Sequence, residues 1–388
     1  MDTERQLTVT IHESVADIPA ADWNACAGPG LDRPDNPFLE HAFFSALESS
    51  GSARAKTGWL PQHISLADNA GAIVGLMPCY LKSHSQGEYV FDHGWAEAFE
   101  RSGGRYYPKL QVSVPFTPVP APKLLVRDPA DDGVRRALLS AAENLARQIE
   151  TSSIHATFLP ETEQAMAVEA GWLPRLDQQF HWSNQGFASF EDFLGTLASR
   201  KRKAIRRERR EALADELSVE WMTGTQLTER HWDRMFAFYM ETGGRKWGRP
   251  YLNRKFFALL GESMADRVLL IFARDGEEII AGALNLIGAD TLHGRYWGCS
   301  RDVPFLHFEL CYYQAIDFAI AHRLGRVEAG AQGEHKLARG YVPQTTWSAH
   351  WIAHAGFRAA VADYLERERR GAARDQAELS RFTPYHRG

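Results

Sequence analysis

The sequence predicts a mixed α/β fold made of two related domains in tandem, residues 1–185 and 186–388. Three observations support this prediction. The chain has 388 residues, which is long for a single hydrophobic core. Stretches with the periodicity of helices alternate with stretches in which apolar and polar residues alternate, as in strands. Three segments of the first half also recur in the same order in the second half, which indicates a duplication.

The recurrence is weak residue by residue, but its order is consistent. The matching segments are residues 43–48 with 256–262, residues 72–77 with 279–284, and residues 138–149 and 155–158 with 310–321 and 326–329. Chance explains one such match more easily than three.

In the first half, strand and helix patterns follow one another closely. Strands are predicted at residues 7–11, 63–67, 72–81, 88–91, 154–159 and 178–182, and helices at 17–27, 36–47, 131–149 and shortly before 171. The segment 94–122 is predicted to be a loop, because its prolines are incompatible with a regular helix or a central strand.

In the second half, residues 293–341 combine a strand, an irregular turn, an apolar helix and a second short strand. This order places several polar side chains at element ends, where a scaffold can direct them at a ligand. We therefore expect the functional site here.

A basic segment opens the second half. Residues 190–215 are predicted to form one long helical segment, and eight of the eleven residues 200–210 are Lys or Arg. Two interpretations stay open. One is a solvated helix face balanced by Glu208, Glu211 and Asp215. The other is a contact for a polyanion, such as a tRNA backbone or anionic lipid.

Composition restricts the classes of protein. The net charge of -5 argues against a dedicated nucleic-acid coat, and no apolar run is long enough for a transmembrane segment. The four cysteines show no metal-type spacing, and the adjacent pair Glu334 and His335 lacks a third ligand, so no metal is predicted. With no signal-peptide pattern, we expect a cytoplasmic protein, and peripheral contact with the inner membrane face stays open.

Several longer words resemble one known family. They are YPKLQ at 107–111, PFTP at 115–118, RKWG at 245–248, PYL at 250–252, RYWG at 295–298, LHFELCYY at 306–313 and EAGAQGEHK at 328–336. In these words the sequence resembles the Fem-like (FemAB-like) peptidoglycan biosynthesis/recognition family of the GNAT acyltransferase superfamily.

The resemblance implies two GNAT-like domains, each a twisted, mostly antiparallel sheet flanked by helices. It also implies acyl or aminoacyl transfer to an amine acceptor, with a peptidoglycan precursor as one possibility. The first domain is expected to bind substrate and the second to perform the transfer. Where GNAT enzymes carry a Gly-rich loop for acetyl-CoA, residues 298–304 read GCSRDVP. No cofactor is therefore predicted, and acyl-CoA and aminoacyl-tRNA both stay open as the acyl donor.

Three residues are predicted to act in catalysis. Glu309 is the first choice for the base that takes a proton from the attacking amine, and His307 is the second. Tyr296 is a donor to the developing oxyanion or an acid. Each has a structural alternative: a carboxylate favoured by the helix dipole, a core histidine and a core tyrosine.

A larger set is predicted to bind substrate. It comprises Tyr107, Lys109, Phe116, Thr117, Arg295, Trp297, Glu328, Gln332, Glu334, His335, Lys336 and Arg339. Among them, His335, Lys336 and Arg339 suit a phosphate or carboxylate. The leading hypothesis is direct transfer without a covalent enzyme intermediate. The alternative is a non-catalytic protein that recognises a cell-wall precursor or muropeptide.

Overall fold

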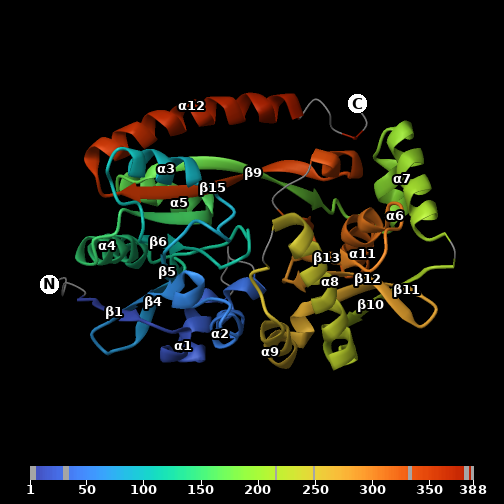
Figure 1. The fold of residues 1–388 in the computed structure, drawn as a ribbon, viewed down its shortest axis with the longest axis horizontal. Coiled ribbons are helices and arrows are strands. Elements are labelled where there is room, and N and C mark those ends of the chain that lie inside the picture. The colour runs from blue at the N-terminus through green and yellow to red at the C-terminus, as the bar shows by residue number, and fades with distance from the viewer. Residues whose placement is uncertain are drawn as a thin grey trace. The chain divides into compact units, whose positions relative to one another are not determined.

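The computed structural model describes residues 6–28, 35–214, 216–247, 250–330, 334–379 and 384–385. The chain divides into two compact units (Figure 1). Unit 1 is Met1–Asp177 with Thr345–Arg374, and unit 2 is Gln178–Gln344 with Asp375–Gly388. Strands β9 (Leu173–Ser183) and β15 (Val342–Ile352) have residues in both units. The division at residues 185/186 stays a prediction.

Unit 1 contains two sheets. The first has the order β1-β3-β4-β7, and the second includes β15-β8-β6-β5-β2. The strands are β1 (Thr8–His12), β2 (Trp59–Pro61), β3 (His63–Ala67), β4 (Ile73–Met77), β5 (Cys79–Lys82), β6 (Lys109–Val112), β7 (Leu125–Val126) and β8 (Ser153–Leu159). The helices are α1 (Ala20–Ala27), α2 (His41–Ser49), α3 (His93–Arg101), α4 (Asp132–Gln148), α5 (Glu161–Glu169) and most of α12 (Ala355–Leu379).

Helix α4 closes the apolar core of unit 1. The Asp131 side chain caps its first turn by accepting from the Val134 amide. Val134, Leu138 and Leu145 follow helical spacing on its buried face. They pack with apolar side chains of β5, β6 and β8, the list being Cys79, Leu110, Val112, Ile154 and Ala156. One face of β5, β6 and β8 is therefore apolar and contributes to the core of unit 1.

Three predicted elements of unit 1 are wrong. The segment 94–122, predicted to be a loop, contains helix α3 and strand β6, and β6 is a central strand between β8 and β5. Its prolines, from Pro108 onward, lie outside both elements, so they do not prevent either.

The predicted strand at residues 72–81 is two strands, β4 and β5, which belong to different sheets. Pro78 stands between them, and it has no N–H to continue a strand ladder. Residues 88–91 form a loop rather than a strand. Glu88 in this loop is turned inward to a buried lysine, as described below.

Unit 2 contains one mostly antiparallel series of strands, β10-β11-β12-β13-β14-β9, in which only β13 and β14 are parallel among the printed pairings. The strands are β10 (Ser218–Thr223), β11 (Val268–Asp275), β12 (Glu278–Ile287), β13 (Thr291–Cys299) and β14 (Arg326–Glu328). The helices are α6 (Phe190–Gly195), α7 (Ser199–Ala212), α8 (Glu229–Trp247), α9 (Arg254–Met264), α10 (Leu306–Phe308) and α11 (Gln314–Ala321).

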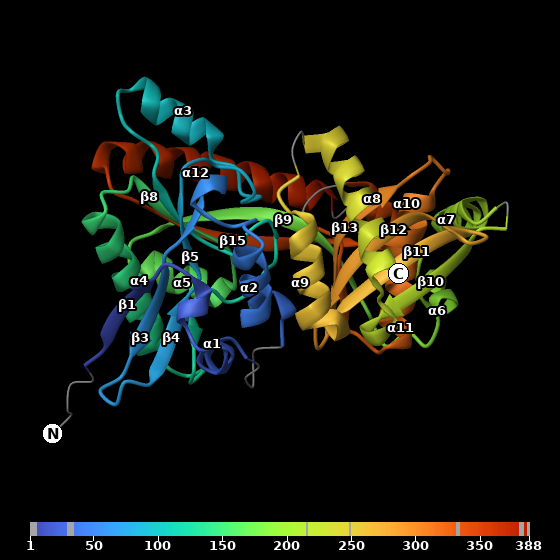
Figure 2. The ribbon, with the colours of Figure 1, turned by 60° about the horizontal axis from the view of Figure 1, so that its bottom comes forward.

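Helices cover the strands of unit 2 as they cover those of unit 1. Figure 2 shows α8 and α9 side by side next to β12 and β13. A π-helical turn, Glu309–Tyr313, joins α10 to α11, so the predicted helix at 310–321 begins earlier, at Leu306. The predicted helical segment 190–215 is interrupted, because Thr196 turns its hydroxyl to the Phe193 carbonyl between α6 and α7.

The fold class is as predicted: a mixed α/β chain whose two parts each combine mostly antiparallel strands with helices. Among the described helices, none has the length and apolar character needed to cross a bilayer.

Candidate functional site

Strand β13 carries a bulge at the predicted site. Leu284 of β12 pairs with Tyr296 and Asn285 pairs with Gly294, so Arg295 is the additional residue between them. Bulges redirect side chains and occur often beside active sites. The two residues that follow the bulge make separate contacts. Tyr296 meets the ring of Tyr239 at 4.9 Å between centroids, whereas Trp297 meets His307 at 5.2 Å.

A cavity of about 490 Å³ lies at the end of β13. Trp297, Thr242 and the loop after β13 line it, together with the first residues of the following helix, Leu306 to Phe308. Its walls are mainly apolar, as in most small-molecule sites, and His307 supplies a titratable group. The predicted catalytic His307 and the predicted substrate-binding Trp297 are therefore neighbours at one cavity.

The loop that lines this cavity differs from a phosphate-binding backbone loop. Pro304 has no N–H to offer a phosphate oxygen, and the Arg301 guanidinium is 2.6 Å from Asp275 Oδ2. Phe305 has a left-handed φ of 61°, which is uncommon for a bulky residue. The sequence of this loop departs from the Gly-rich acetyl-CoA loop, and its backbone and its paired arginine differ from a phosphate-binding loop as well.

Aromatic side chains surround His307. Its ring centroid is 5.4 Å from that of Tyr312 and 6.4 Å from that of His335. The Tyr312 hydroxyl lies 2.9 Å from His335 Nε2, and burial raises the pKa of Tyr312. Arg339 stacks on Phe308, with its Cζ 3.4 Å from the ring centroid. The structure therefore brings together residues predicted from separate words of the sequence.

Glu309 directly follows Phe308 in the chain, but its side chain contacts helix α7. Its side chain is fully buried, and both carboxylate oxygens accept from the Arg209 guanidinium, at 2.9 and 3.1 Å. Gln314 Nε2 donates to Oε1 at 2.8 Å. Burial raises the pKa of Glu309 although Arg209 opposes the rise. Its role as the base stays a prediction, and the geometry gives its carboxylate a structural partner in helix α7.

Glu328 forms a second buried acid-base group. Strand register places His293 of β13 and His181 of β9 on either side of it. Its carboxylate is 2.9 Å from His293 Nδ1 and 3.9 Å from the Arg295 guanidinium. Burial alone would raise the pKa of Glu328, but His293 and His181 hold it well below its ordinary value. The predicted ligand contacts Glu328 and Arg295 are therefore close to each other and enclosed.

The remaining predicted residues of this segment have protein partners or lie outside the description. Lys336 Nζ donates to the Gly330 carbonyl at 3.0 Å, and burial lowers the pKa of Lys336 to about 8. Arg339 donates to Glu208 Oε2 at 2.9 Å. Gln332 lies outside the described residues, and Glu334 is described only in its backbone, within a 3-10 helix. Their substrate-binding roles stay predictions.

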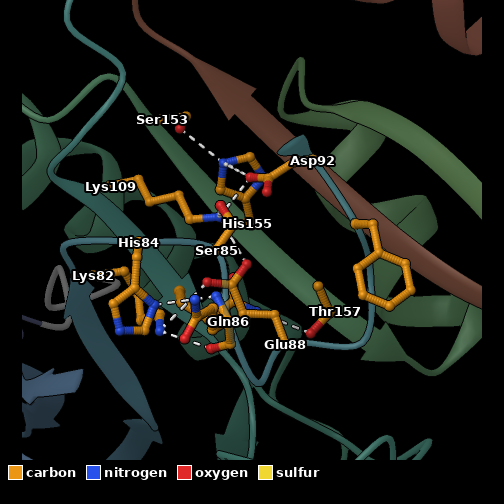
Figure 3. Close-up of polar contacts among 12 residues, drawn as sticks. Lys82, His84, Ser85, Gln86, Glu88, Asp92, Lys109, Ser153, His155 and Thr157 are labelled. Carbon is orange, nitrogen blue, oxygen red and sulfur yellow. Dashed lines mark hydrogen bonds and ion pairs between the residues drawn. The ribbon is translucent and has the colours of Figure 1, made fainter. Parts of the chain in front are cut away.

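In unit 1, Lys109 is the centre of a buried ionic cluster (Figure 3). Its Nζ donates to Glu88 Oε2 at 2.7 Å and to Asp92 Oδ2 at 2.5 Å. A third bond runs to Ser85 Oγ at 2.8 Å, so all three protons of the ammonium are used. Burial would lower the pKa of Lys109, but the two carboxylates raise it above its ordinary value.

Two histidines extend this cluster. His155 Nδ1 is 2.7 Å from His350 Nδ1, and His155 Nε2 is 2.8 Å from Ser153 Oγ and 3.6 Å from Asp92 Oδ2. Burial lowers the pKa of His155 to about 3, so the imidazole is neutral at physiological pH. Serine and aspartate meet the same ring nitrogen here. A nucleophilic triad needs them at opposite nitrogens, so this arrangement does not form one.

The other predicted residues of unit 1 lie around the cluster. The Tyr107 hydroxyl is 2.8 Å from Ser85 Oγ, and Phe116 meets Trp59 at 5.1 Å between ring centroids. Thr117 is buried.

Helix α7 carries the basic segment. Arg209 faces inward to Glu309 and Asp317, while Arg206 pairs with Glu191 across the surface. Arg200, Lys203, Arg207 and Arg210 are exposed, and their spacing places them on one side of the helix. The segment is thus partly a structural face and partly an exposed basic stripe.

Several residues of these sites were not predicted. They are Thr242, Tyr312 and Arg209 in unit 2, and Lys82, Ser85, Glu88, His155 and His350 in unit 1. A signal for the second group exists, because Lys109, Gln111 and Ser113 alternate with apolar residues, as do Ser153, His155 and Thr157. Within the described ranges, no group of three His, Cys, Asp or Glu side chains is arranged to hold a metal ion.

A family model described as peptidoglycan biosynthesis/recognition, FemAB-like, matches residues 14–387. The chain belongs to the FemAB-like family. The predicted family is confirmed. No curated protein matches the chain.

Solved structures share the fold of this FemAB-like chain. FemX is 12% identical over 92% of this chain and 100% of its own, with a TM-score of 0.54. L-PGS from Bacillus licheniformis is 9% identical over 87% and 99%, with a TM-score of 0.51. The C-terminal domain of a putative lysylphosphatidylglycerol synthetase from Agrobacterium fabrum is 10% identical over 90% and 96%, with a TM-score of 0.52. The predicted fold class, mixed α/β with mostly antiparallel sheets and flanking helices, is confirmed, and at these identities the likeness concerns the fold.

Proposed function

We propose that this FemAB-like protein transfers an acyl or aminoacyl group to an amine acceptor at the cavity of unit 2. The observation that carries the proposal is the position of His307, which lines an apolar cavity of about 490 Å³ beside the bulged end of β13. A peptidoglycan precursor is the proposed acceptor, in keeping with the family.

In this proposal His307 is the base. The amine nitrogen attacks the acyl carbonyl carbon, the new C–N bond forms, and the bond from that carbon to the donor's sulfur or oxygen breaks. His307 takes the proton lost by the nitrogen and returns it to the leaving group. Glu309 has a positioning role, because its carboxylate joins the π-helical turn to Arg209 of α7. The catalytic role predicted for Tyr296 stays a proposal.

The donor is proposed to be acyl-CoA or aminoacyl-tRNA. The loop after β13 contains Pro304 and an Arg301 already paired with Asp275, which does not favour a CoA pyrophosphate. The exposed stripe on α7 favours a polyanion such as tRNA, because exposed Lys and Arg exchange counterions for phosphates.

A second function is recognition without catalysis. The observation that favours it is the burial of the predicted base Glu309 and the use of both its oxygens by Arg209. Under this proposal the same cavity binds a cell-wall precursor or muropeptide and no donor is consumed.

The test uses the full chain, acetyl-CoA or alanyl-tRNA as donor, and a UDP-linked muramyl pentapeptide with a free amine. Mass spectrometry of the acceptor is expected to show one added acyl group. His307→Gln should lower turnover by roughly 100-fold or more while acceptor binding persists. His322→Gln is the matched control, because His322 is exposed at the end of α11.

Two results would count against this proposal, the first against the role of His307 and the second against transfer itself. Equal turnover of the two variants removes His307 as the base. If the unaltered protein binds the acceptor but consumes neither donor, the recognition function is supported instead.

A further inference from the structure

In the second sheet of unit 1, one face is both buried and polar. One face of β5, β6 and β8 packs against α4, as described above. The opposite face carries Tyr80, Lys82, Lys109, Gln111, Ser153, His155 and Thr157, all of them buried. Burying polar groups is unfavourable unless each is hydrogen-bonded. A whole polar face across three neighbouring strands therefore needs a reason other than stability.

The two lysines on this face differ. Lys109 uses all its protons on Ser85, Glu88 and Asp92. Lys82 has fewer partners: its Nζ donates to the Gln86 carbonyl at 3.1 Å and is 3.6 Å from Glu88 Oε1, too far for a hydrogen bond. It also lies 3.6 Å above the Trp59 ring. Burial lowers the pKa of Lys82 to about 7, which shows how weakly its charge is compensated.

Several buried oxygens of this face accept no hydrogen bond. Glu88 Oε1, Asp92 Oδ1 and Gln111 Oε1 have no hydrogen-bond donor among the described residues. Glu88 and Asp92 each bind Lys109 through their other oxygen, so two of these oxygens belong to carboxylates that share one ammonium. All three atoms accept hydrogen bonds, and the side chains are at least nine-tenths buried. Ser113 Oγ, on the same side of the chain leaving β6, is also unpaired.

We propose that this face of unit 1 is a binding site for a small ligand that carries a primary ammonium group. An ammonium has three N–H donors and no acceptor, which matches three oxygens that only accept. The charges of Lys82 and Lys109 balance those of Glu88 and Asp92, so partial loss of the Lys82 proton leaves the site negative. A cation restores the balance.

Residues 83–92 form a segment that a ligand would have to pass to reach this face. Residues 83–92 lie over the lysines, and Figure 3 shows Ser85, Glu88 and Asp92 of this segment turned toward Lys109. Within it, Gly87 has φ +81° and Tyr89 has φ 61°, two left-handed residues close together. Ligand entry requires this segment to move. The site is in the unit that does not hold the cavity, so it goes beyond the proposed transfer.

Isothermal titration of the full chain tests the proposal with alaninamide, which has a free primary amine and no carboxylate. N-acetylalaninamide is the matched probe, because acetylation removes only the ammonium. We expect saturable heat with alaninamide and none with its acetylated form. Equal binding of both probes, or of neither, overturns the proposal; no binding of either means that ordered water satisfies these oxygens.

Two variants locate the binding. Glu88→Gln keeps an oxygen for Lys109 but removes the charge, and we expect alaninamide to bind roughly tenfold or more weakly. Ser113→Ala removes a hydroxyl that has no partner, so folding is preserved and weaker binding reports a ligand contact. Glu97→Gln, on the exposed side of α3, is the control. If Ser113→Ala and Glu88→Gln, both confirmed as folded by near-UV circular dichroism, bind like the control, the site is not here.

Discussion

The two units use buried charge differently. In unit 2 the buried carboxylates of Glu309 and Glu328 each have a cation or an imidazole beside them: Glu309 has Arg209, and Glu328 has His293. In unit 1 the carboxylates of Glu88 and Asp92 each keep one oxygen without a hydrogen bond. A cavity of about 490 Å³ adjoins His307, whereas segment 83–92 covers the charges of unit 1. The presence of buried charged residues therefore does not by itself indicate a binding site. More informative are polar atoms that lack a hydrogen bond and a cavity through which a ligand can reach them.

This comparison separates two kinds of experiment. Changes in the enclosed cluster of unit 1 should act first on folding. Changes at the cavity of unit 2 should act first on turnover, because its lining includes the titratable group without burying it completely.

The largest effect is expected from Lys109→Met in unit 1. The substitution leaves two buried carboxylates without their cation, so the free energy of unfolding should fall by roughly 3–5 kcal/mol. Urea unfolding followed by circular dichroism measures this. Arg136→Met is the control, because Arg136 pairs with Glu169 on the surface of the same unit and should change stability by at most about 1 kcal/mol. Similar losses for both variants would show that the cluster does not hold the unit together.

Glu309→Gln in unit 2 should have a smaller effect. Glutamine keeps a hydrogen bond to Arg209, and Arg209 keeps Asp317, so we expect a loss of roughly 1–3 kcal/mol in unfolding free energy. Turnover should stay within about tenfold of the unaltered protein, since the side chain positions rather than reacts. A fall of 100-fold or more at unchanged stability would instead establish Glu309 as the base.

The pH dependence of stability should differ between the two units. The pKa of Lys82 is about 7 when folded and 10.5 in its ordinary state, because burial disfavours the charge. Between these values the unfolded chain binds a proton that the folded chain lacks, so rising pH stabilises the fold. Lys82→Met should remove this rise from pH 7 upward. Lys336→Met should remove it only from about pH 8 upward, given its pKa of about 8.

Urea titrations at pH 7, 8 and 9 measure these differences. A stability difference between Lys82→Met and the unaltered protein that is the same at each pH would show that Lys82 does not titrate in this range.

The smallest effect on folding is expected on helix α7. Replacing Arg200, Lys203 and Arg210 by Gln should leave unfolding within about 0.5 kcal/mol, since these residues are exposed. If tRNA binds here, the slope of log affinity against log salt should shrink by roughly 2–3 units. Filter binding of tRNA across salt concentrations checks this. An unchanged slope would leave the stripe as solvated surface.

Much of the fold was predictable because periodicity is a local property. The alternation in 63–67 and the helical spacing in 132–148 both appear in the structure as β3 and α4. The sequence also singled out His307 and Trp297, which line one cavity in the structure, and their roles stay predictions. The bulge at Arg295 was not predicted, because pairing with β12 defines it.

The partners of charged residues were not predictable in the same way. Glu309 and Arg209 are 100 residues apart, and the π-helical turn changes which way Glu309 points. Lys109 donates a hydrogen bond to Glu88, which lies in a segment predicted to be a strand. The alternation of Lys109, Gln111 and Ser113 was a usable signal for a polar sheet face. Which atoms on that face stay unpaired depends on the covering loop, and no local pattern encodes that.

The return of residues 345–374 to unit 1 has a consequence for synthesis on the ribosome. β15 pairs with β8, and Phe357, Val361 and Leu365 of α12 pack with Trp95 and Tyr106 of unit 1. These contacts become available only after residues 178–344 have been made. The first 177 residues therefore emerge with strand β8 lacking one neighbour and with an exposed apolar patch, and they wait for the whole of the following unit to be made. The first unit would therefore still be incomplete long after it has left the exit tunnel. Chaperones that bind nascent chains would meet it in that state.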